Sequence, residues 1–574
     1  METLRLRLEE ALCKTITNEW GGSVPAEAIR EAASVEFTRD SEHGDFTTSL
    51  AMKLAGRLKK KPEELAREVL EHLKEIWPEV EDVFARIEIA GGRFLNFALR
   101  KGAYLETLRE IVARKDEFGK SNIGKGLKVQ VEFVSANPTG PLTVAHGRQA
   151  AVGEAIANLL TEVDYSVERE FYLNDTGNQI RILGESTYHH YTRLFGKDYP
   201  FPEDGYRGDY IADVAFEIAE AEGKRFLDTP PEKAIEAIGE LAAGIILEGI
   251  KKDLHEFGVT FDVYYSQREL EKSGKVEKVL AFFKEKGLAY EKDGALWLKT
   301  SEFGDVEDRV LKKSDGLYTY RTADIAYHKD KFDRGFTRVI NLWGPDHHGH
   351  VQTMAAAIKA LGYPRESVTM MIVQFCTLYE GKEKLKMSTR SGQFITLREV
   401  FENVGVDASR YFFLNRKTDS HLDFDLELAK KESPENPVYY IQYAHARTMS
   451  VFAKALEKAK EDPEFGLETC DFRDGMYLPR EVDLSVLEEN DLGLVRFLGR
   501  YPRALAKAAS DLDPARLTTY LEEVASYFHN YYSYQRIITD EILGTKARLF
   551  LLSALRLVLG NALRILGIRA PEKM

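Results

Sequence analysis

The stretch "KVQVEFVSANPTGPLTVAHGRQAAVGEAI" (residues 128–156) passes from an apolar run through a loop with two prolines into a segment of helical spacing. The run KVQVEFV predicts a buried strand, and the residues from His146 onward predict a helix. Pro138 and Pro141 stiffen the loop, and Gly140 lets its backbone approach a ligand. Since phosphates favour helix N-termini beyond the carboxyl ends of parallel strands, His146 is a candidate phosphate contact. For this stretch alone, a histidine that merely caps its helix is the competing interpretation.

Strands and helices alternate outward from this stretch. A strand-like segment at 165–175 precedes a long helical stretch to about residue 258, and "RVINLWG" (338–344) leads into a helix at 351–362. This alternation predicts a doubly wound parallel sheet. A compact module of helices and short strands precedes the polar link "KSNIGKGLK" (120–128), and only helical spacing remains after about residue 434.

The predicted fold class is therefore α/β, with a small α+β N-terminal domain, a parallel-sheet domain and an all-helical C-terminal domain. We expect the boundaries at residues 1–119, 120–430 and 431–574, with a helical insertion at about 180–290 of the middle domain.

The composition limits the possible settings of this chain. It has 574 residues, 44% hydrophobic and 30% charged, which predicts several globular domains. No apolar run approaches the ~18 residues of a membrane span, and the acidic, amphipathic start does not resemble a signal peptide. Cys13, Cys376 and Cys470 form no C-x-x-C pair, which disfavours disulfides and thiolate zinc sites. We expect a cytoplasmic protein without a membrane partner.

The net charge of −14 argues against a nucleic-acid partner unless basic residues cluster locally. Two clusters are present: "RLKKK" at 57–61, and a possible helical stripe of Arg496, Arg500, Arg503 and Lys507. A solvated surface face is the simplest interpretation of each cluster taken alone.

A second polar loop, "EKLKMSTRSGQFITL" (383–397), carries Lys384, Lys386, Ser388 and Arg390, which suit the charge of a phosphate transition state. Together the two loops resemble the paired signatures of class I aminoacyl-tRNA synthetases. "TVAH" at 143–146 stands for His-Ile-Gly-His, and "KMST" at 386–389 stands for Lys-Met-Ser-Lys.

The surrounding segments resemble the arginyl-tRNA synthetase family in particular. In family order they read "HGDF", "GRFLNF", "SANPTGPL", "FYLNDTGNQ", "YTYRTADIAYH", "WGPDHHGH", "DSHLDFDLELAKKESPENPVYYIQYAHAR" and "LGIRAPEKM". The resemblance implies a Rossmann-like catalytic domain, an N-terminal tRNA-binding module and a helical anticodon-binding domain. It also implies ATP-dependent activation of L-arginine to arginyl-adenylate and its transfer to the 3′ end of tRNA(Arg). We expect Mg²⁺ only as a partner of ATP, no protein-bound metal, and a monomer.

The resemblance also assigns roles by motif position. Catalysis would involve His146, Thr143, Lys384, Lys386 and Ser388, and the ATP site Pro138, Gly140, Ala145, Gly147, Gly344, Asp346, His347, His348 and Met387. The planar arginine cation calls for carboxylates and other acceptors, here Glu132, Ser135, Asn137, Tyr320, Asp324 and Gln352. Contacts to tRNA, including aromatic stacking on bases, would come from Arg57, Lys59, Lys60, Lys61, Tyr439, Tyr443, Arg447, Arg496, Arg500 and Met574.

The chain departs from both signatures. Thr143 and Ala145 replace a histidine and a glycine, and Thr389 replaces the final lysine of the second signature. The lysine that often compensates just before the first signature is absent, since those positions read Thr139-Gly140. Two alternatives therefore remain: a metal-dependent phosphoester hydrolase that uses "DHHGH" (346–350), and a synthetase-like protein that binds tRNA without activating arginine.

Overall fold

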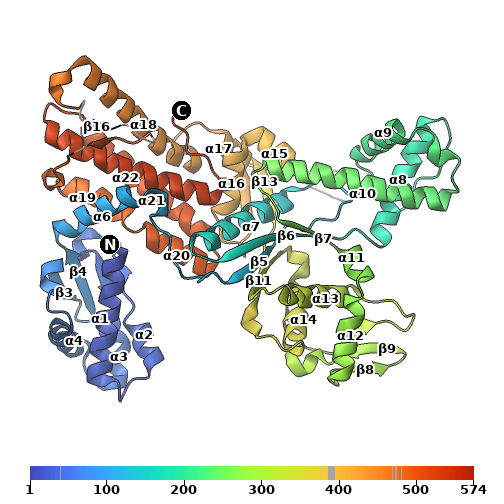
Figure 1. The fold of residues 1–574 in the computed structure, drawn as a ribbon, viewed down its shortest axis with the longest axis horizontal. Coiled ribbons are helices and arrows are strands. Elements are labelled where there is room, and N and C mark those ends of the chain that lie inside the picture. The colour runs from blue at the N-terminus through green and yellow to red at the C-terminus, as the bar shows by residue number, and fades with distance from the viewer. Residues whose placement is uncertain (39, 386–394, 468–469, 472–474, 480) are drawn as a thin grey trace.

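A twisted parallel sheet lies at the centre of the computed structural model, which describes residues 1–574 apart from 39, 386–394, 468–469, 472–474 and 480 (Figure 1). Its five strands run in the order β12-β11-β5-β6-β7. All neighbouring strands are parallel. The strands are β5 (Lys128–Glu132), β6 (Ser166–Leu173), β7 (Val263–Ser266), β11 (Arg338–Trp343) and β12 (Val368–Ile372). The predicted α/β class with a parallel sheet is confirmed.

Helix α7 (Val144–Glu162) follows β5 after the proline-bearing loop and is buried along almost its whole length. Gly153 allows the helix to lie directly against the strand end, because a Cβ there would come within 2.2 Å of Phe133 Cγ. The frequent Ala and Gly residues of α7 thus reflect packing on all sides rather than one apolar face.

Two insertions interrupt the sheet. The first, between β6 and β7, contains α8 (Asn178–Leu194), α9 (Tyr210–Glu222) and α10 (Pro231–Glu256), which extend away from the sheet (Figure 1). The second contains α11 (Gln267–Lys272), α12 (Lys275–Glu285) and an antiparallel sheet of β8 (Ala289–Lys292), β9 (Ala295–Leu298) and β10 (Arg309–Lys312). The region 180–290, expected as one helical insertion, therefore also contains β7, a strand of the central sheet.

After the second insertion, helices α13 (Tyr320–Asp333) and α14 (His348–Ala360) flank β11 in the chain. Beyond β12 comes a small sheet in the order β14-β13-β15, formed by Glu383–Lys384, Cys376–Glu380 and Leu422–Asp425. The short helices α15 (Leu397–Val404), α16 (Val406–Leu414) and α17 (Leu426–Lys430) complete this domain.

The N-terminal domain has its own hydrophobic core and an antiparallel sheet in the order β1-β2-β4-β3. Its elements are α1 (Glu2–Trp20), α2 (Ala26–Ala32), β1 (Glu36–Phe37), β2 (Phe46–Thr48), α3 (Leu50–Leu58), α4 (Pro62–Ile76), α5 (Val80–Val83), β3 (Phe84–Ala90) and β4 (Phe94–Leu99). Helix α6 (Lys101–Arg114) connects it to the central domain.

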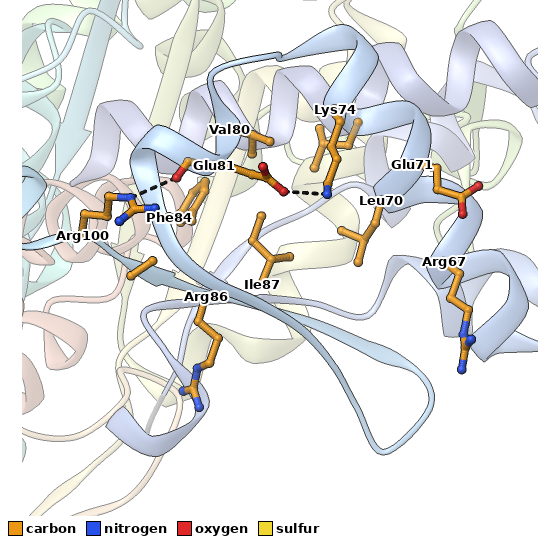
Figure 2. A pocket seen from close by; sticks show the side chains of 12 residues that line it. Arg67, Leu70, Glu71, Lys74, Val80, Glu81, Phe84, Arg86, Ile87 and Arg100 are labelled. Carbon is orange, nitrogen blue, oxygen red and sulfur yellow. Dashed lines mark hydrogen bonds and ion pairs between the residues drawn. The ribbon is translucent and has the colours of Figure 1, made fainter.

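A cavity of about 470 Å³ opens between α4 and β3 (Figure 2). Its floor is apolar, and its rim is charged but already paired: Lys74 binds Glu81 at 2.6 Å, and Arg67 binds Glu63 at 2.7 Å. Arg100 Nε donates to the backbone oxygen of Glu81 at 3.0 Å. This cavity is therefore a surface depression whose cations are largely neutralised.

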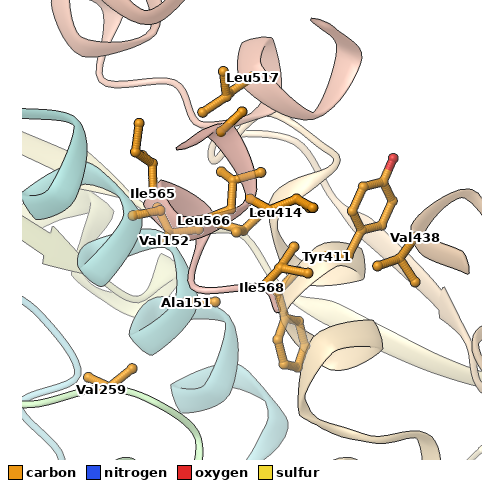
Figure 3. Close-up of a cluster of buried hydrophobic side chains, with 14 of the residues drawn as sticks. Ala151, Val152, Val259, Tyr411, Leu414, Val438, Leu517, Ile565, Leu566 and Ile568 are labelled. Carbon is orange, nitrogen blue, oxygen red and sulfur yellow. The ribbon is translucent and has the colours of Figure 1, made fainter. Parts of the chain in front are cut away.

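The C-terminal region is helical, with α18 (Pro437–Glu461), α19 (Glu489–Leu498), α20 (Tyr501–Asp511), α21 (Ala515–Tyr534) and α22 (Ile542–Leu566), and includes one two-residue strand pair, Cys470–Asp471 with Leu478–Pro479. Its core is continuous with that of the central domain. Figure 3 shows Ala151 and Val152 of α7 near Leu414 of α16 and Ile565 and Leu566 of α22. Helix α22 is long and apolar enough to cross a membrane, but 78% of its apolar window is buried in the fold.

A buried ion pair joins the N-terminal domain to helix α19. Arg496 Nε lies 3.2 Å from Asp45 Oδ1 of the "HGDF" segment, and Arg496 also donates to Thr38 Oγ1 and the Gly44 oxygen. Tyr104 donates to the same carboxylate at 2.7 Å. Arg496 is only 6% exposed, whereas a basic stripe on a solvated surface would expose it. It is buried because it joins helix α19 to the N-terminal domain.

We predict that Gly153→Ala lowers the free energy of unfolding by about 1–3 kcal/mol, because the added methyl overpacks the contact with Phe133. Gly249→Ala is the matched control: Gly249 lies on the exposed face of α10, where a Cβ meets nothing within 4 Å. It should stabilise by about 0.5–1 kcal/mol. Urea unfolding of both variants measures the difference, and equal stabilities would contradict the packing argument.

Candidate active site

A cavity of about 610 Å³ lies beyond the carboxyl ends of β5 and β11. Connections leave these adjacent strands toward opposite edges of the sheet, since β6 and β7 follow on one side and β12 on the other. Ligands of open α/β sheets bind at such a switch point. Ten of the predicted site residues line this cavity: Glu132, Ser135, Asn137, Ala145, His146, Tyr320, Asp324, Gly344, Asp346 and His347.

The chain turns sharply where it leaves β5. Val134 and Ser135 both have positive φ angles, 66° and 39°, which is unusual for residues with side chains. Ser135 stabilises the turn, because its hydroxyl donates to Glu132 Oε1 at 3.0 Å and accepts from the Tyr172 N–H at 3.1 Å. The turn and the residues that follow it, up to Asn137, line the cavity.

His146 has two tasks. It forms a capping box with Thr143 at the start of α7, in which its Nδ1 accepts the Thr143 backbone N–H at 3.1 Å. Burial lowers the pKa of His146 to about 4, so the ring is neutral near pH 7. With Nδ1 accepting from the backbone, the proton of the neutral ring lies on Nε2. The capping interpretation and the phosphate-contact interpretation are therefore compatible: one nitrogen caps the helix, and the other is a donor.

A chain of buried polar groups lies beneath the cavity. Lys331 Nζ binds Glu132 Oε2 at 2.6 Å and Asn341 Oδ1 at 3.0 Å. Asn341 Nδ2 lies 2.6 Å from His328 Nε2, and His328 Nδ1 lies 2.8 Å from the backbone oxygen of Asp324. Burial holds the pKa of His328 well below its usual value, so it joins this chain as a neutral ring. Since Lys331 neutralises Glu132, the carboxylate of Asp324 is less compensated than that of Glu132.

Asp324 projects from the first turns of α13 and remains partly exposed. His350 Nε2 lies 3.1 Å from its Oδ2, and the Tyr320 ring packs 5.6 Å from the His350 ring. One oxygen of Asp324 is thus held, while the side chain still faces the cavity. A cationic guanidinium would complement this arrangement.

Sequence reasoning missed three contributors to this site. Tyr172 lines the cavity, and its buried hydroxyl has no partner among the described residues. Lys331 neutralises Glu132, and His350 orients Asp324. Tyr172 stands in "FYLNDTGNQ" and His350 in "WGPDHHGH", so the motifs contained a signal for both. Nothing local in the sequence marks Lys331.

Other predicted residues lie away from this cavity. Gly140 and Thr143 line an adjoining one, and Gly147 packs against Leu397 and Phe413, where a Cβ would come within 2.6 Å of Leu397. Gln352 donates to the Gly304 oxygen at 2.9 Å. Pro138, exposed His348 and exposed Lys384 do not line the cavity. Lys386, Met387 and Ser388 are outside the described residues, as is Thr389.

The "DHHGH" segment spreads its side chains rather than gathering them. Asp346 and His347 line the cavity, His348 is exposed, and His350 is turned inward to Asp324. Across the described part of the chain, no three His, Cys, Asp or Glu residues are grouped so that they could hold a metal ion.

The predicted tRNA contacts fall into three groups. Arg57, Lys59 and Lys61 are exposed around the end of α3, while Lys60 pairs with Glu68. On α18, Tyr439 stacks on Tyr443 at 6.1 Å, and the Arg447 guanidinium lies 4.6 Å from the Tyr443 ring. Arg500, like Arg496, faces the N-terminal domain, where it donates to the Thr38 oxygen at 2.8 Å. Met574 is half exposed at the chain end.

Three family models match the chain in order. They are "Arginyl tRNA synthetase N terminal domain" at residues 2–99, "tRNA synthetases class I (R), catalytic domain" at 231–431 and "DALR anticodon binding domain" at 441–574. The fold and the site thus define the chain as a class I aminoacyl-tRNA synthetase.

Individual relatives agree on the family. The arginine–tRNA ligase of Carboxydothermus hydrogenoformans is 45% identical over 577 residues, which cover 98% of this chain and 100% of that protein. The enzyme of Syntrophotalea carbinolica is 46% identical, covering 94% of this chain and 95% of its own. This chain belongs to the arginyl-tRNA synthetase family, which confirms the resemblance seen in the sequence.

Solved structures show the same architecture. An arginyl-tRNA synthetase from Campylobacter jejuni superposes with a TM-score of 0.73 at 33% identity, covering 83% of this chain and 100% of that one. The Thermus thermophilus arginyl-tRNA synthetase has a TM-score of 0.77 at 23% identity and full coverage of both chains, a likeness of fold.

We predict that the two roles of His146 can be separated by substitution. His146→Ala should lose the helix cap, about 0.5–2 kcal/mol, and also slow arginine activation about 100- to 1000-fold. His146→Gln is the matched control, because glutamine at this position of a capping box still accepts the backbone N–H. It should keep wild-type stability and yet remain slow. Activation rates and thermal unfolding of both variants measure this, and a normal rate in either variant removes His146 from the chemistry.

The pKa of His146 also predicts how stability depends on pH. The folded-state pKa of about 4 lies below the usual 6.5. The stabilisation of the folded state by the neutral ring is therefore fully present above pH 6.5 and is lost as the pH falls toward 4. Wild-type protein should therefore lose stability faster than His146→Gln between pH 6.5 and 4.5. Urea unfolding across this range tests it, and parallel pH dependences would show that the buried ring is not the cause.

Proposed function

We propose that this chain uses the cavity beyond β5 and β11 to join L-arginine to ATP and then transfers the arginyl group to the 3′ end of tRNA(Arg). The assignment rests on one observation: an acidic pocket and a hydrogen-bond donor lie next to each other at one switch point of the sheet. An acidic, partly desolvated pocket around Asp324 lies beside a helix start whose neutral histidine carries its N–H donor at Nε2.

The arginine end of the reaction is assigned to the α13 side of the cavity. Asp324, oriented by His350, would pair with the guanidinium, and Tyr320 and Tyr172 would flank it. Glu132 supports this pocket from below through Lys331 rather than as a free charge. Ser135 and Asn137 hold the turn that brings the substrate carboxylate toward the phosphate loop.

The nucleotide end is assigned to the loop before α7 and to residues 344–347. The arginine carboxylate attacks the α-phosphorus of ATP, the bond to the bridging oxygen breaks, and pyrophosphate leaves. No enzyme nucleophile takes part, so this chain's contribution is positioning and stabilisation of charge. His146 Nε2–H would donate to a phosphate oxygen, and Mg²⁺ would accompany ATP as part of the substrate.

Recognition of tRNA is assigned to both ends of the chain. The proposed domains are residues 1–119, 120–430 and 431–574, with the tyrosine and arginine cluster of α18 as a stacking surface for anticodon bases. The exposed cations at 57–61 provide a backbone contact on the N-terminal domain. We also propose a cytoplasmic monomer.

The decisive experiment is exchange of labelled pyrophosphate into ATP, measured with arginine and tRNA(Arg) present and with each omitted in turn. Arginine-dependent exchange and charging of tRNA support the assignment. Binding of tRNA without exchange would favour a protein that recognises tRNA only, and ATP consumption independent of arginine would favour a hydrolase.

We predict that Asp324→Ala raises the KM for arginine about 30-fold to a few thousand-fold, because truncating one partner of a desolvated ion pair costs about 2–5 kcal/mol. The KM values for ATP and tRNA should change little. Asp333→Ala on the same helix is the control, since Asp333 pairs only with the surface residue Lys329 in the described structure. Steady-state charging of folded variants gives the constants, and an arginine KM within about threefold of wild type would exclude Asp324 as the guanidinium partner.

A further inference from the structure

The main cavity has an unbalanced charge for a reaction that expels pyrophosphate. Its described lining contains the carboxylates of Asp324 and Asp346, and that of Glu132, which Lys331 neutralises from outside the lining, but neither a lysine nor an arginine. Transition states of phosphoryl and nucleotidyl transfer gain negative charge on phosphate oxygens, which positioned cations stabilise. The sequence lacks two further cations. Thr389 replaces the final lysine of the second signature, and Gly140 stands where a compensating lysine often precedes the first.

An adjoining cavity of about 620 Å³ contains a cation. It shares Ala136, Asn137 and His146 with the main cavity, so the two meet at the phosphate loop. Its opposite wall is the segment between α8 and α9 at residues 203–210. Among all described residues that line either cavity, Arg207 is the single lysine or arginine.

The Arg207 side chain is available to bind an anion. Its guanidinium lies 5.8 Å from the centre of the Phe201 ring. Within the described residues it makes no ion pair, although Glu203 and Asp204 line the same cavity. An arginine packed on an aromatic ring keeps its N–H edges free for the bidentate recognition of phosphate.

The segment that carries Arg207 is fixed at both ends rather than loose. The Tyr210 hydroxyl donates to the Thr139 backbone oxygen at 2.8 Å, and burial raises the pKa of Tyr210, which keeps that donor protonated. On the other side the Tyr206 N–H donates to Ser186 Oγ of α8 at 3.0 Å. Arg207 is therefore held between a contact to the phosphate loop and a contact to the helical insertion.

We propose that Arg207 binds the pyrophosphate end of ATP and stabilises it as it leaves, supplying from the insertion a positive charge in addition to those of Lys384 and Lys386, since Gly140 and Thr389 carry none. The inference rests on the proposed function. In the step concerned, an arginine carboxylate oxygen forms a bond to the α-phosphorus and the bond to the bridging oxygen breaks. The electron pair departs on pyrophosphate, whose added negative charge faces the guanidinium.

The test compares Arg207→Gln and Arg207→Lys with wild-type protein in pyrophosphate exchange with arginine and tRNA(Arg). Loss of a charge-assisted hydrogen bond should lower the exchange rate about 10- to 100-fold in Arg207→Gln, with the KM for arginine within about threefold. Arg207→Lys should recover part of the rate, because it keeps the charge. Arg225→Gln is the matched control: Arg225 is an exposed arginine of the same insertion, paired with Glu222 and outside both cavities.

Product inhibition of charging separates this role from a structural one. Inorganic pyrophosphate should inhibit Arg207→Gln about 10- to 100-fold more weakly than wild type, whereas inhibition by AMP, which lacks the leaving group, should stay the same. Equal weakening by both inhibitors, or exchange and pyrophosphate inhibition within about threefold of wild type, would overturn the proposal. Absence of exchange in wild-type protein would overturn the proposed function and this inference together, whereas an active wild type matched by Arg207→Gln would overturn the inference alone.

Discussion

The site depends on one buried cation that is bound by backbone carbonyls. Arg148, two residues after His146, is fully buried and donates to the backbone oxygens of Gln374, Lys417 and Ser420 at 2.8–2.9 Å. Burial lowers the pKa of Arg148, yet its ordinary value is so high that it remains charged. A buried guanidinium is tolerated only where its donors are satisfied, so the start of α7, the segment that follows β12 and the turn before β15 are held in one arrangement.

The same kind of buried arginine fixes helix α16. Arg410 of α16 is also fully buried, and it donates to the Phe257 oxygen at the end of the first insertion and to the Leu566 oxygen at the end of α22. Gly567 is required beside it, because a Cβ would come within 2.3 Å of the guanidinium. Arg148 thus connects α7 to the segments around residues 374 and 417–420, and Arg410 connects α16 to the first insertion and to α22. A continuous hydrophobic core also joins α7 to the C-terminal helices.

The acidic residues Glu132 and Asp324 of the cavity differ in how their charges are compensated. Glu132 is neutralised by Lys331, and the pair lies beneath the cavity as part of its scaffold. Asp324 receives only the histidine contact and keeps an exposed edge. On the phosphate side a neutral histidine and a guanidinium from the insertion face the same loop. In the proposed reaction, Asp324 would face the cationic substrate in one cavity, and Arg207 would face the anionic leaving group in the adjoining one.

The sequence by itself determined the strand, the proline loop and the helix of residues 128–156, because apolar periodicity and turn residues report local structure directly. It also determined the reaction class, because the motifs keep their order along the chain. Only the tertiary structure decided that His146 caps its helix through Nδ1, that Arg496 is buried against Asp45, that Lys331 neutralises Glu132, and that Arg207 lines one cavity with the phosphate loop. The residues of these last three pairings are between about 60 and 450 positions apart in the chain. Side-chain periodicity defines which face of an element is buried, but the partner on that face is set by packing among distant elements.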